Sequence, residues 1–428
     1  MYYYENCAAD FRSRRQLLNS VVKIMTYVNE HFCIKLMKIL MKVIGMWFDK
    51  LSYDRFITNV SLLCIGTCLA VAVTIEGLSI FFMERDFNET FEALSCTNSV
   101  VQEVIKLLYC ICNRSKINDL NRFTEVTFWK IKYDTFSNEI LNRCNEICIY
   151  TIVPFMIFIH MTGYTFALET LIAPPPANSS KSRLPFVLWW TDSDPSSPYF
   201  EMVYILEGLA SVVVANCAAT FSVFIFIVIT YTTAQFQILH YKLEITCKEY
   251  SKNTNVKSAV QSLESEKTYD KLKECIKMHQ MLIWYINELD ETFNFLMLIQ
   301  VVSSVLTLCV SGCQVCLGVS STFWWRNIMF FLSGLIQILL IAWPCNELIL
   351  NSEAVADAAY RAVWYCLPNN RHGKAYTRAL LMIIIRSRQP CQLSVGKFCS
   401  MSLNTFCSVL STAMSYFTML RQVTMEED

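Results

Sequence analysis

Hydroxyl and amide side chains recur with helical spacing near the C-terminus of the chain. On a wheel of about 100° per residue with Ser408 at zero, they fall within about 60° of one line, and apolar side chains occupy the opposite face. Such a face either makes hydrogen bonds between packed helices or lines a water-filled pore. Met419 lies about 20° from the same line, so it would interrupt a wet face with an apolar group. The polar residues are Asn404, Thr405, Ser408, Ser411, Thr412, Ser415 and Gln422, and the apolar ones are Leu403, Phe406, Leu410, Ala413 and Phe417.

Few other residues have the types and spacing of a reactive or metal-binding site. The chain has no HExxH, no GxSxG and no phosphate-binding glycine loop, so we do not expect an enzyme. Cys313 and Cys316 have the spacing of zinc ligands but lack a second pair, and packing explains them better. His160 is either a ligand contact or a hydrogen-bonded structural histidine. We therefore expect no metal and no cofactor.

Three ionisable side chains, Glu76, Lys106 and Glu207, fall within or near the ends of long apolar segments. Charged groups are costly to place in a bilayer, which makes a functional role a reasonable default for them. Each could instead reach the membrane interface or a partner helix. The sequence assigns none of the three a definite role.

These residues belong to a strongly apolar chain. Of its 428 residues 54% are hydrophobic and 17% are charged, against about a quarter charged in an ordinary soluble domain. The 36 basic and 36 acidic residues cancel, so the net charge gives no bias toward nucleic acid, which we do not expect as a partner. Apolar runs long enough to cross a hydrocarbon core of about 30 Å lie near Ile57–Phe82, Ala93–Cys112, Asn145–Ala167, Phe200–Tyr231, Phe293–Leu317, Asn327–Trp343 and Gly396–Leu420. The sequence thus predicts seven transmembrane spans.

Lysine and arginine are distributed unevenly among the segments that connect these spans. They gather in the N-terminal 56 residues and after spans 2, 4 and 6, and they are sparse in the other connections. Basic residues concentrate on the cytosolic side of membrane proteins. The sequence therefore predicts an all-α membrane protein of seven transmembrane helices with a cytosolic N-terminus, an extracellular C-terminus and a cytosolic helical anchor domain.

The regions between the spans differ in character. The cytosolic N-terminus, residues 1–56, should contain an interfacial helix over Phe32–Trp47, with Lys35, Lys38 and Lys42 facing lipid headgroups or water. Spans 1–6 occupy residues 57–343, which include an extracellular lid (168–199) and cytosolic helical extensions (235–292). After them we expect a cytosolic anchor segment (344–395), a pore-lining span 7 (396–420) and an extracellular tail (421–428).

The C-terminal third also carries a set of residues in a distinctive order and spacing. In sequence order they are Glu274-Cys275-Ile276, His279-Gln280, Ser352, Ala359-Tyr360, Trp364-Tyr365, Ile385-Arg386, Arg388, Pro390, Leu403, Thr405-Phe406, Val409-Leu410, Ser415-Tyr416-Phe417-Thr418 and Leu420-Arg421-Gln422. In these residues the chain resembles the insect odorant receptor family, over roughly residues 270–422. The N-terminal half resembles it only in its span pattern and in Gly45-Met46-Trp47.

This resemblance implies an odorant receptor that is a ligand-gated nonselective cation channel. Four subunits would surround one pore lined by span 7, in the plasma membrane of olfactory sensory neurons. The partners implied are a conserved co-receptor subunit, a volatile small-molecule odorant, permeating monovalent and divalent cations, and membrane lipid. The co-receptor carries a long cytosolic insertion that this chain lacks, so the chain resembles the odorant-binding subunit of a heterotetramer.

The resemblance and the helical pattern together suggest particular residues. Met419 would narrow the pore as an apolar gate, Gln422 would hydrate ions beyond it, and Ser408, Ser411 and Ser415 would line the pore. Tyr360 and Trp364, four residues apart on one helical face, would anchor the contact between subunits. We expect the outer halves of spans 2, 3, 4 and 6 to enclose the ligand. The candidate ligand-binding residues are Phe155, Phe158, Met161, Met202, Ile205, Phe330 and Gly334.

Two other classes of multi-span membrane protein fit the sequence less well. A G-protein-coupled chemosensory receptor would place its N-terminus outside, and neither a DRY-like triplet nor an NPxxY motif occurs where it should. A secondary transporter would show repeated halves and discontinuous helices, and the sequence shows neither. The alternative to the channel is a seven-transmembrane G-protein-coupled chemosensory receptor.

Overall fold

The computed structural model describes residues 32–47, 52–82, 87–131, 133–172, 199–248, 258–316 and 324–427. Most of the expected extracellular lid, together with the first 31 residues, lies outside this part of the chain. The described residues form α2 (Phe32–Val43), α3 (Ser52–Phe82), α4 (Phe87–Cys112), α5 (Arg114–Thr124), a π-helical turn (Glu125–Trp129), α6 (Thr135–Ile172), α7 (Tyr199–Ile245), α9 (Ser258–Cys316), α10 (Trp324–Glu353), α11 (Val355–Arg361), a 3-10 turn (Trp364–Cys366), α12 (Arg371–Ser387), β1 (Ser394–Val395), β2 (Cys399–Ser400) and α13 (Leu403–Glu427). The expected all-helical fold is confirmed.

Helices occupy each of the seven expected spans. Five are both long and apolar enough to cross a membrane by length and composition; four lie within α3, α6, α7 and α9, and the fifth, Trp325–Cys366, runs from α10 to the 3-10 turn. The other two expected spans, in α4 and α13, form helices of 26 and 25 residues with more polar side chains. Span 7 begins later than expected, at Leu403 instead of Gly396. The reason is that Gly396 and Lys397 have positive φ angles of 57° and 64°, which a helix cannot contain.

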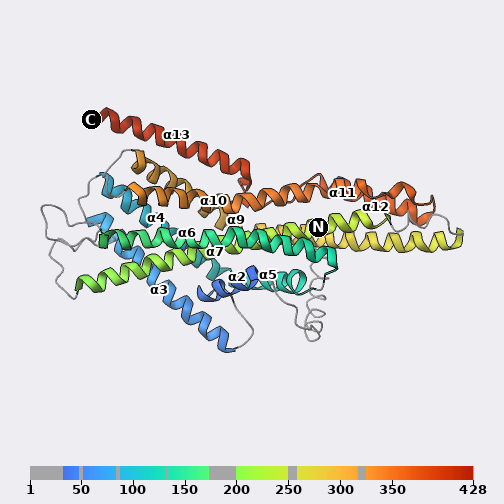
Figure 1. The fold of residues 1–428 in the computed structure, drawn as a ribbon, viewed down its shortest axis with the longest axis horizontal. Coiled ribbons are helices and arrows are strands. Elements are labelled where there is room, and N and C mark those ends of the chain that lie inside the picture. The colour runs from blue at the N-terminus through green and yellow to red at the C-terminus, as the bar shows by residue number, and fades with distance from the viewer. Residues whose placement is uncertain are drawn as a thin grey trace.

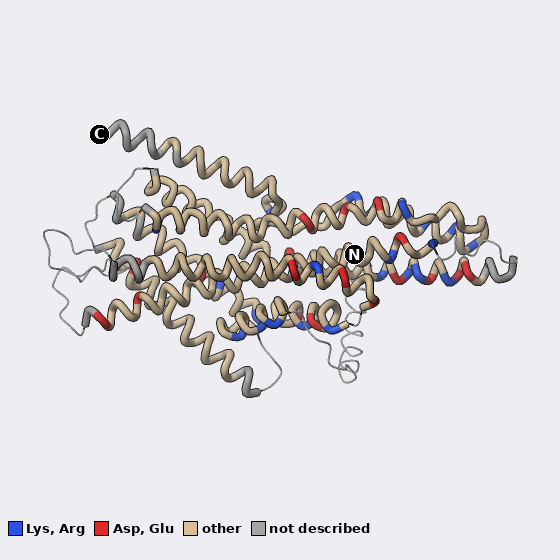
Figure 2. Tube along the Cα trace, viewed as in Figure 1, with Lys and Arg blue, Asp and Glu red and all other residues tan. Residues whose placement is uncertain are grey.

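Helices α7 and α9 lie along the longest dimension of the molecule and contact each other (Figure 1). They contain 47 and 59 residues, so α9 is roughly 90 Å long, about three times the thickness of a hydrocarbon core. Charged residues gather at the right end of the view, where α9 begins and α11 and α12 lie, and few occur in the left half (Figure 2). Helix α9 therefore combines a charged half, up to Glu291, with an uncharged half, whereas α7 carries charged residues only near its two ends.

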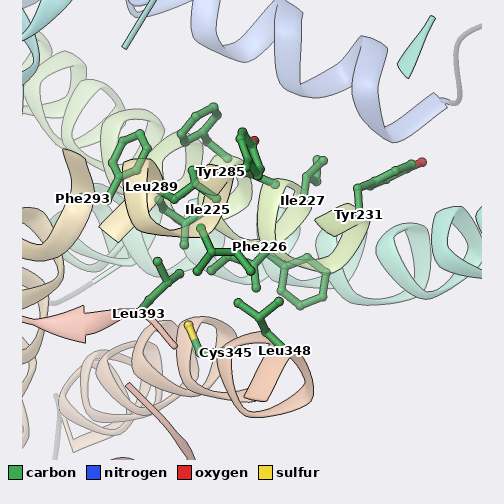
Figure 3. Close-up of a cluster of buried hydrophobic side chains, with 14 of the residues drawn as sticks. Ile225, Phe226, Ile227, Tyr231, Tyr285, Leu289, Phe293, Cys345, Leu348 and Leu393 are labelled. Atoms are coloured by element: carbon green, nitrogen blue, oxygen red, sulfur yellow. The ribbon is translucent and has the colours of Figure 1, made fainter. Parts of the chain in front are cut away.

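The core of the molecule lies where α7 passes between α9 and α10. Ile225, Phe226 and Ile227 of α7 are almost fully buried, against Tyr285, Leu289 and Phe293 of α9 and Cys345 and Leu348 of α10 (Figure 3). A helix that is apolar on all sides belongs in an interior, and the stretch of α7 from Phe221 to Ile229 is buried throughout. Leu393, just before β1, joins the same cluster and so fixes the C-terminal segment to the core.

Helix α2 packs more deeply than its sequence suggests. Cys33, Ile34, Met37 and Met41 are buried against the core. Lys35 is exposed, as expected for a residue that faces water or headgroups.

Lys38 of α2 does not face headgroups or water, and for this residue the expectation is wrong. Its Nζ lies 2.8 Å from Glu125 Oε1, and 5.5 and 5.8 Å from the ring centroids of Trp47 and Trp129. The π-helical turn that holds Glu125 and Trp129 brings them beside α2. Burial by itself raises the pKa of Glu125, but the hydrogen bonds from Lys38 and Lys130 outweigh it and hold the pKa below its ordinary value.

A short antiparallel hairpin of β1 and β2 connects α12 to α13. Ser394 pairs with Ser400 and Val395 with Cys399. Gly396 sits at the turn, where a Cβ would lie 2.8 Å from Leu298 Cδ2 of α9, so the position accepts only glycine without rearrangement. The hairpin therefore sets the place from which α13 starts.

Candidate functional site

A cavity opens between α3, α4, α6, α7, α9 and α10, with an empty volume of about 880 Å³ that includes its mouth. Much of its wall consists of small or apolar side chains. Its apolar lining includes Ala72, Val100, Ile159, Ala210, Val214, Ala215, Ala218, Phe330 and Gly334, and its polar lining includes Glu76, Ser99, Gln102, Glu103, Thr162, Ser211, Gln300, Ser304, Thr307, Ser333 and Gln337. Although many of these residues are polar, most of the exposed wall area is apolar, and a concave space with a mainly apolar surface is typical of a small-molecule site.

A buried polar cluster, made of Gln102, Glu103, Lys106, Gln300 and Gln337, adjoins the cavity. Lys106 Nζ lies 2.8 Å from Glu103 Oε1 and 2.7 Å from Gln300 Oε1, and both charged side chains are only 2% exposed. Gln102 Nε2 donates to Glu103 Oε1 at 3.1 Å and to Gln300 Oε1 at 3.0 Å. Such a pair survives in an apolar interior only when its charges are matched and its remaining groups are hydrogen-bonded.

The cluster ties helix α4 to α9 and α10. Gln300 Nε2 donates to Ser304 Oγ at 3.1 Å on its own helix and to Gln337 Oε1 of α10 at 3.2 Å. One turn earlier on α4, Asn98 Nδ2 donates to Ser303 Oγ at 3.0 Å and to Thr307 Oγ1 at 3.1 Å. Polar contacts of this kind stabilise helix association where the solvent is lipid.

The C-terminal helix presents its polar face outward. Ser408, Ser411, Ser415 and Met419 are exposed, whereas the opposite face packs on the bundle through Phe406, Val409 and the buried Ala413. Several hydroxyls on this helix donate to a carbonyl of the preceding turn, including Ser408 to Asn404 O, Thr412 to Ser408 O and Ser415 to Ser411 O. Each hydroxyl oxygen then has its lone pairs directed away from the helix axis as an acceptor.

Comparison with known proteins identifies this arrangement. The model of the 7tm odorant receptor family matches residues 86–414. The chain belongs to that family. Odorant receptor 13a of Drosophila melanogaster is 22% identical to this receptor over 372 residues, which cover 84% of this chain and 86% of the relative. Odorant receptor Or2 of Anopheles gambiae is 29% identical over 157 residues, which cover 36% of this chain and 40% of the relative.

A solved structure has the same fold as this receptor. It is the insect olfactory receptor OR5 from Machilis hrabei in complex with eugenol, which superposes with a TM-score of 0.73 at 14% identity, covering 91% of this chain and 97% of the other. The seven-transmembrane fold expected from the sequence is thereby confirmed. Odorant receptors are not an enzyme family, and the G-protein-coupled alternative is not favoured.

Two of the seven candidate ligand-binding residues of the receptor, Phe330 and Gly334, line the cavity. Phe155 is buried in the core and Phe158 is half-buried, and neither is part of the cavity wall. Met161, Met202 and Ile205 lie on the outside of the chain, 49%, 59% and 59% exposed. Hydropathy locates the helices but not their rotation, and that rotation decides which residues face inward. The assignment of these residues to ligand binding stays a prediction.

Sequence reasoning missed most of the polar residues around the cavity. It singled out Glu76, which lines the cavity, and Lys106, which lies behind the wall, but not Glu103, Gln102, Gln300 or Gln337. The available signal was the recurrence of Gln and Glu inside apolar runs, where such side chains require partners. Glu207, the third ionisable residue, is 9% exposed and lies outside the cavity lining.

The two residues expected to anchor subunit contacts do not share a helical face. Helix α11 ends at Arg361, because Ala362 is extended with ψ of 123°, and Trp364 starts a separate 3-10 turn. Tyr360 is 71% exposed, whereas Trp364 is half-buried and packs against the core. Nearby, Leu381, Met382 and Ile385 form an exposed apolar face on α12.

Proposed function

We propose that this receptor is a subunit of an odorant-gated nonselective cation channel, which binds a volatile compound in its cavity and opens a pore lined by α13. The observation that carries the proposal is the position of α9. This helix lines the cavity through Gln300, Ser304 and Thr307, and it packs against β1 and α13. A ligand that moves or stiffens α9 would therefore act on the helix proposed to line the pore.

The exposed face of α13 suits cations. The hydroxyls of Ser408, Thr412 and Ser415 donate within the helix, so they present oxygen acceptors outward, and such oxygens can replace part of the water around a cation. Met419, 65% exposed on the same side, would form an apolar constriction where the pore dewets when closed. Ser408, Ser411 and Ser415 would line the pore on one side of it, and Gln422 would follow on the other.

We infer that several chains assemble around this pore, with the conserved co-receptor as the partner of this receptor in a heterotetramer. Support comes from two uncovered surfaces of the single chain, the polar face of α13 and the apolar side chains Tyr360, Leu381, Met382 and Ile385 near the charged end. Association through residues 344–395 would cover the second surface. Packing between spans gains little from the hydrophobic effect in lipid, so the contacts outside the bilayer would hold the assembly together.

The orientation proposed is an N-terminus in the cytosol and a C-terminus outside, in the plasma membrane of olfactory sensory neurons. The support is the separation of a charged half from an uncharged half along α9, together with the basic residues of the connecting segments. The expected regions follow that orientation: 57–343 for spans 1–6, 235–292 and 344–395 on the cytosolic side, and 421–428 outside.

Expression in cells, with and without the co-receptor, tests the proposal. A panel of volatile compounds should evoke a cation current only in cells that contain this chain and the co-receptor. The current should start without the delay of a second messenger and persist in excised patches. A response that needs G-protein signalling, or epitope tags showing the N-terminus outside, would overturn it.

A further inference from the structure

A smaller crevice lies where the end of α2 meets α3, α4 and α5. Its empty volume is about 490 Å³, mouth included, and it shares no lining residue with the larger cavity. Among the described residues around it, Arg114 is the only charged one. The lining consists of Met41, Gly45, Met46, Leu62, Cys110, Ile111, Arg114, Ile117, Phe221, Phe224 and Phe293.

Close contacts fix the walls of this crevice. Gly45 has a φ of 75°, and an added Cβ would lie 2.7 Å from Leu62 Cβ and 2.8 Å from Thr58 O. Only glycine therefore lets α2 end this close to α3. At the α7 and α9 side of the crevice, the ring centroids of Phe224 and Phe293 are 5.5 Å apart. The crevice is thus part of the packed fold.

In the proposed orientation the crevice lies at the level of the inner leaflet. Leu62 is about 8 Å along the helix from Ile57, the cytosolic start of the expected span 1. Cys110 and Ile111 are in the last turn of the expected span 2, and Arg114 follows just beyond that span. Apolar side chains therefore line the depth of the acyl chains, and a guanidinium lies at the depth of the lipid phosphates.

The crevice is on the lipid-facing side of the chain. Helices α2 and α3 lie on the opposite side of α7 and α9 from α13, the helix proposed to line the pore (Figure 1). The lining residue Ile111 is exposed, and so are Leu63, next to Leu62 on α3, and Leu108, one turn before Ile111 on α4. The medium at the mouth of the crevice is therefore lipid.

The two helices beside the crevice carry an excess of basic residues. Helix α2 has three lysines and no acidic residue, and α5 has Arg114, Lys116 and Arg122 against Asp119. Figure 2 shows that basic residues are frequent along both helices. Arg114 Nη2 donates to Asn59 Oδ1 of α3 at 3.0 Å, which directs the guanidinium toward α3. A guanidinium is a planar donor group that suits a phosphate.

We propose that this crevice binds an anionic phospholipid of the inner leaflet, with one acyl chain among the apolar side chains and the phosphate at Arg114. The acyl chain alone gives little selectivity, because lipid tails are as apolar as the crevice. The net negative charge of the headgroup provides it, since one basic residue near the membrane surface favours an anionic lipid about fivefold. The inference goes beyond the proposed function and takes from it only the orientation.

Photolabelling of the full-length receptor in lipid vesicles tests the inference. Phosphatidylserine or phosphatidylcholine with a diazirine in one acyl chain is added as a minor component of phosphatidylcholine vesicles, and peptide mass spectrometry locates the label. We expect label on residues 41–46 and 110–117, about fivefold more from the phosphatidylserine probe than from the phosphatidylcholine probe. Equal labelling of these residues by the two probes would overturn the inference.

Two pairs of variants separate the crevice from the general lipid surface. Ile111→Trp fills the mouth and should reduce the label on residues 41–46 severalfold, whereas Leu108→Trp, exposed on the same helix but outside the lining, should not. Arg114→Gln should remove most of the preference for phosphatidylserine, whereas Lys116→Gln, an equal change of charge outside the lining, should keep it. Unchanged labelling of Ile111→Trp, or an unchanged preference in Arg114→Gln, would overturn the inference. Should Arg114→Gln fail to fold, the tryptophan pair decides alone.

The labelling assay is independent of channel activity. It needs neither an odorant nor the co-receptor, so a failure to label the crevice would leave the proposed channel intact. Conversely, a chain that labels as expected but gives no odorant-evoked current would retain the lipid site and lose the proposed function.

Discussion

The carboxylate of Asp290 accepts two hydrogen bonds from Ser394, one from its backbone N–H at 2.6 Å and one from its hydroxyl at 2.7 Å. Asp290 is on α9, and Ser394 is the first residue of the hairpin that leads into α13. Farther along the same helix, Gln300 belongs to the polar cluster beside the cavity. Helix α9 thus contacts both the candidate ligand site and the hairpin that immediately precedes α13, the candidate pore helix.

Asp290→Ala should uncouple ligand binding from channel opening. The variant loses two hydrogen bonds to a charged group, each worth about 1.5–3 kcal/mol, so α9 would hold the hairpin less firmly. We expect the half-maximal odorant concentration to rise about tenfold or more and the maximal current to fall. Whole-cell dose–response curves, normalised to surface expression, measure this. The neighbouring Glu291→Ala removes only an exposed pair with Lys116 and should behave as wild type; equal effects of the two variants would contradict the coupling.

Gly396→Ala should damage the same junction through the backbone. Gly396 has a φ of 57°, and an added Cβ would meet Leu298 at 2.8 Å, so the variant is strained in conformation and in space. A loss of roughly 1–3 kcal/mol is expected, seen as a lower melting temperature of the purified protein and lower surface expression. Gly208→Ala on α7, where no heavy atom lies within 4 Å of the added Cβ, should be neutral or slightly stabilising.

Met419→Ala should open the channel partly without odorant, or change its ion selectivity. A smaller side chain widens an apolar constriction and lowers the cost of wetting it. Basal current and relative permeabilities in expressing cells measure the effect. Leu420→Ala, about 100° around the helix, should change neither property beyond effects on expression. A Met419→Ala channel with normal surface expression and unaltered basal current and permeability would rule out the gate.

Tyr360→Ala and Met382→Ser should weaken association with the co-receptor more than Trp364→Ala does. Tyr360 and Met382 are 71% and 68% exposed in the single chain, whereas Trp364 packs against its own core. Quantitative co-purification from solubilised cells should show at least a severalfold loss for the first two variants. Trp364→Ala should mainly lower the melting temperature. The reverse order would place the interface elsewhere.

Glu125→Gln should destabilise the receptor near neutral pH but not in acid. The pKa of Glu125 in the folded chain lies below its ordinary value of 4.5, because the hydrogen bonds from Lys38 and Lys130 outweigh burial. The ionised carboxylate therefore stabilises the fold fully above about pH 4.5, and this contribution is lost as the pH falls through the folded pKa. Melting curves of purified wild type and variant should differ by about 2 kcal/mol at pH 7 and converge once the pH has fallen below the pKa of Glu125 in the folded chain. A constant difference across this range would contradict the ion-pair account.

Sequence patterns predicted the spans well because long apolar runs are nearly diagnostic of membrane crossing. They failed where a few backbone angles decide the outcome. The helical face assumed for Tyr360 and Trp364 is broken by the extended Ala362, and the start of span 7 is displaced by the positive φ angles of Gly396 and Lys397. Neither position contains a proline, the residue from which a helix end is most easily predicted.

The cavity was harder to predict than the fold for a different reason. Its wall comes from six helices, and a rotation of one helix by half a turn exchanges an inward side chain for an outward one. Met202 and Ile205 are exposed for this reason, although the hydropathy of α7 is as high as expected. The exposed polar face of α13 was visible in the sequence because there the pattern itself is one-sided.

The hydroxyls of α13 that bond back to their own helix also bear on how the protein is made. A lone chain in the bilayer has no pore, so this face would contact lipid until partners arrive. Because the hydroxyls of Ser408, Thr412 and Ser415 donate hydrogen bonds within the helix, α13 can enter hydrocarbon without leaving these donors unpaired. In the proposed channel, each subunit could therefore be inserted singly, and water would reach the hydroxyl oxygens only once the subunits surround the pore.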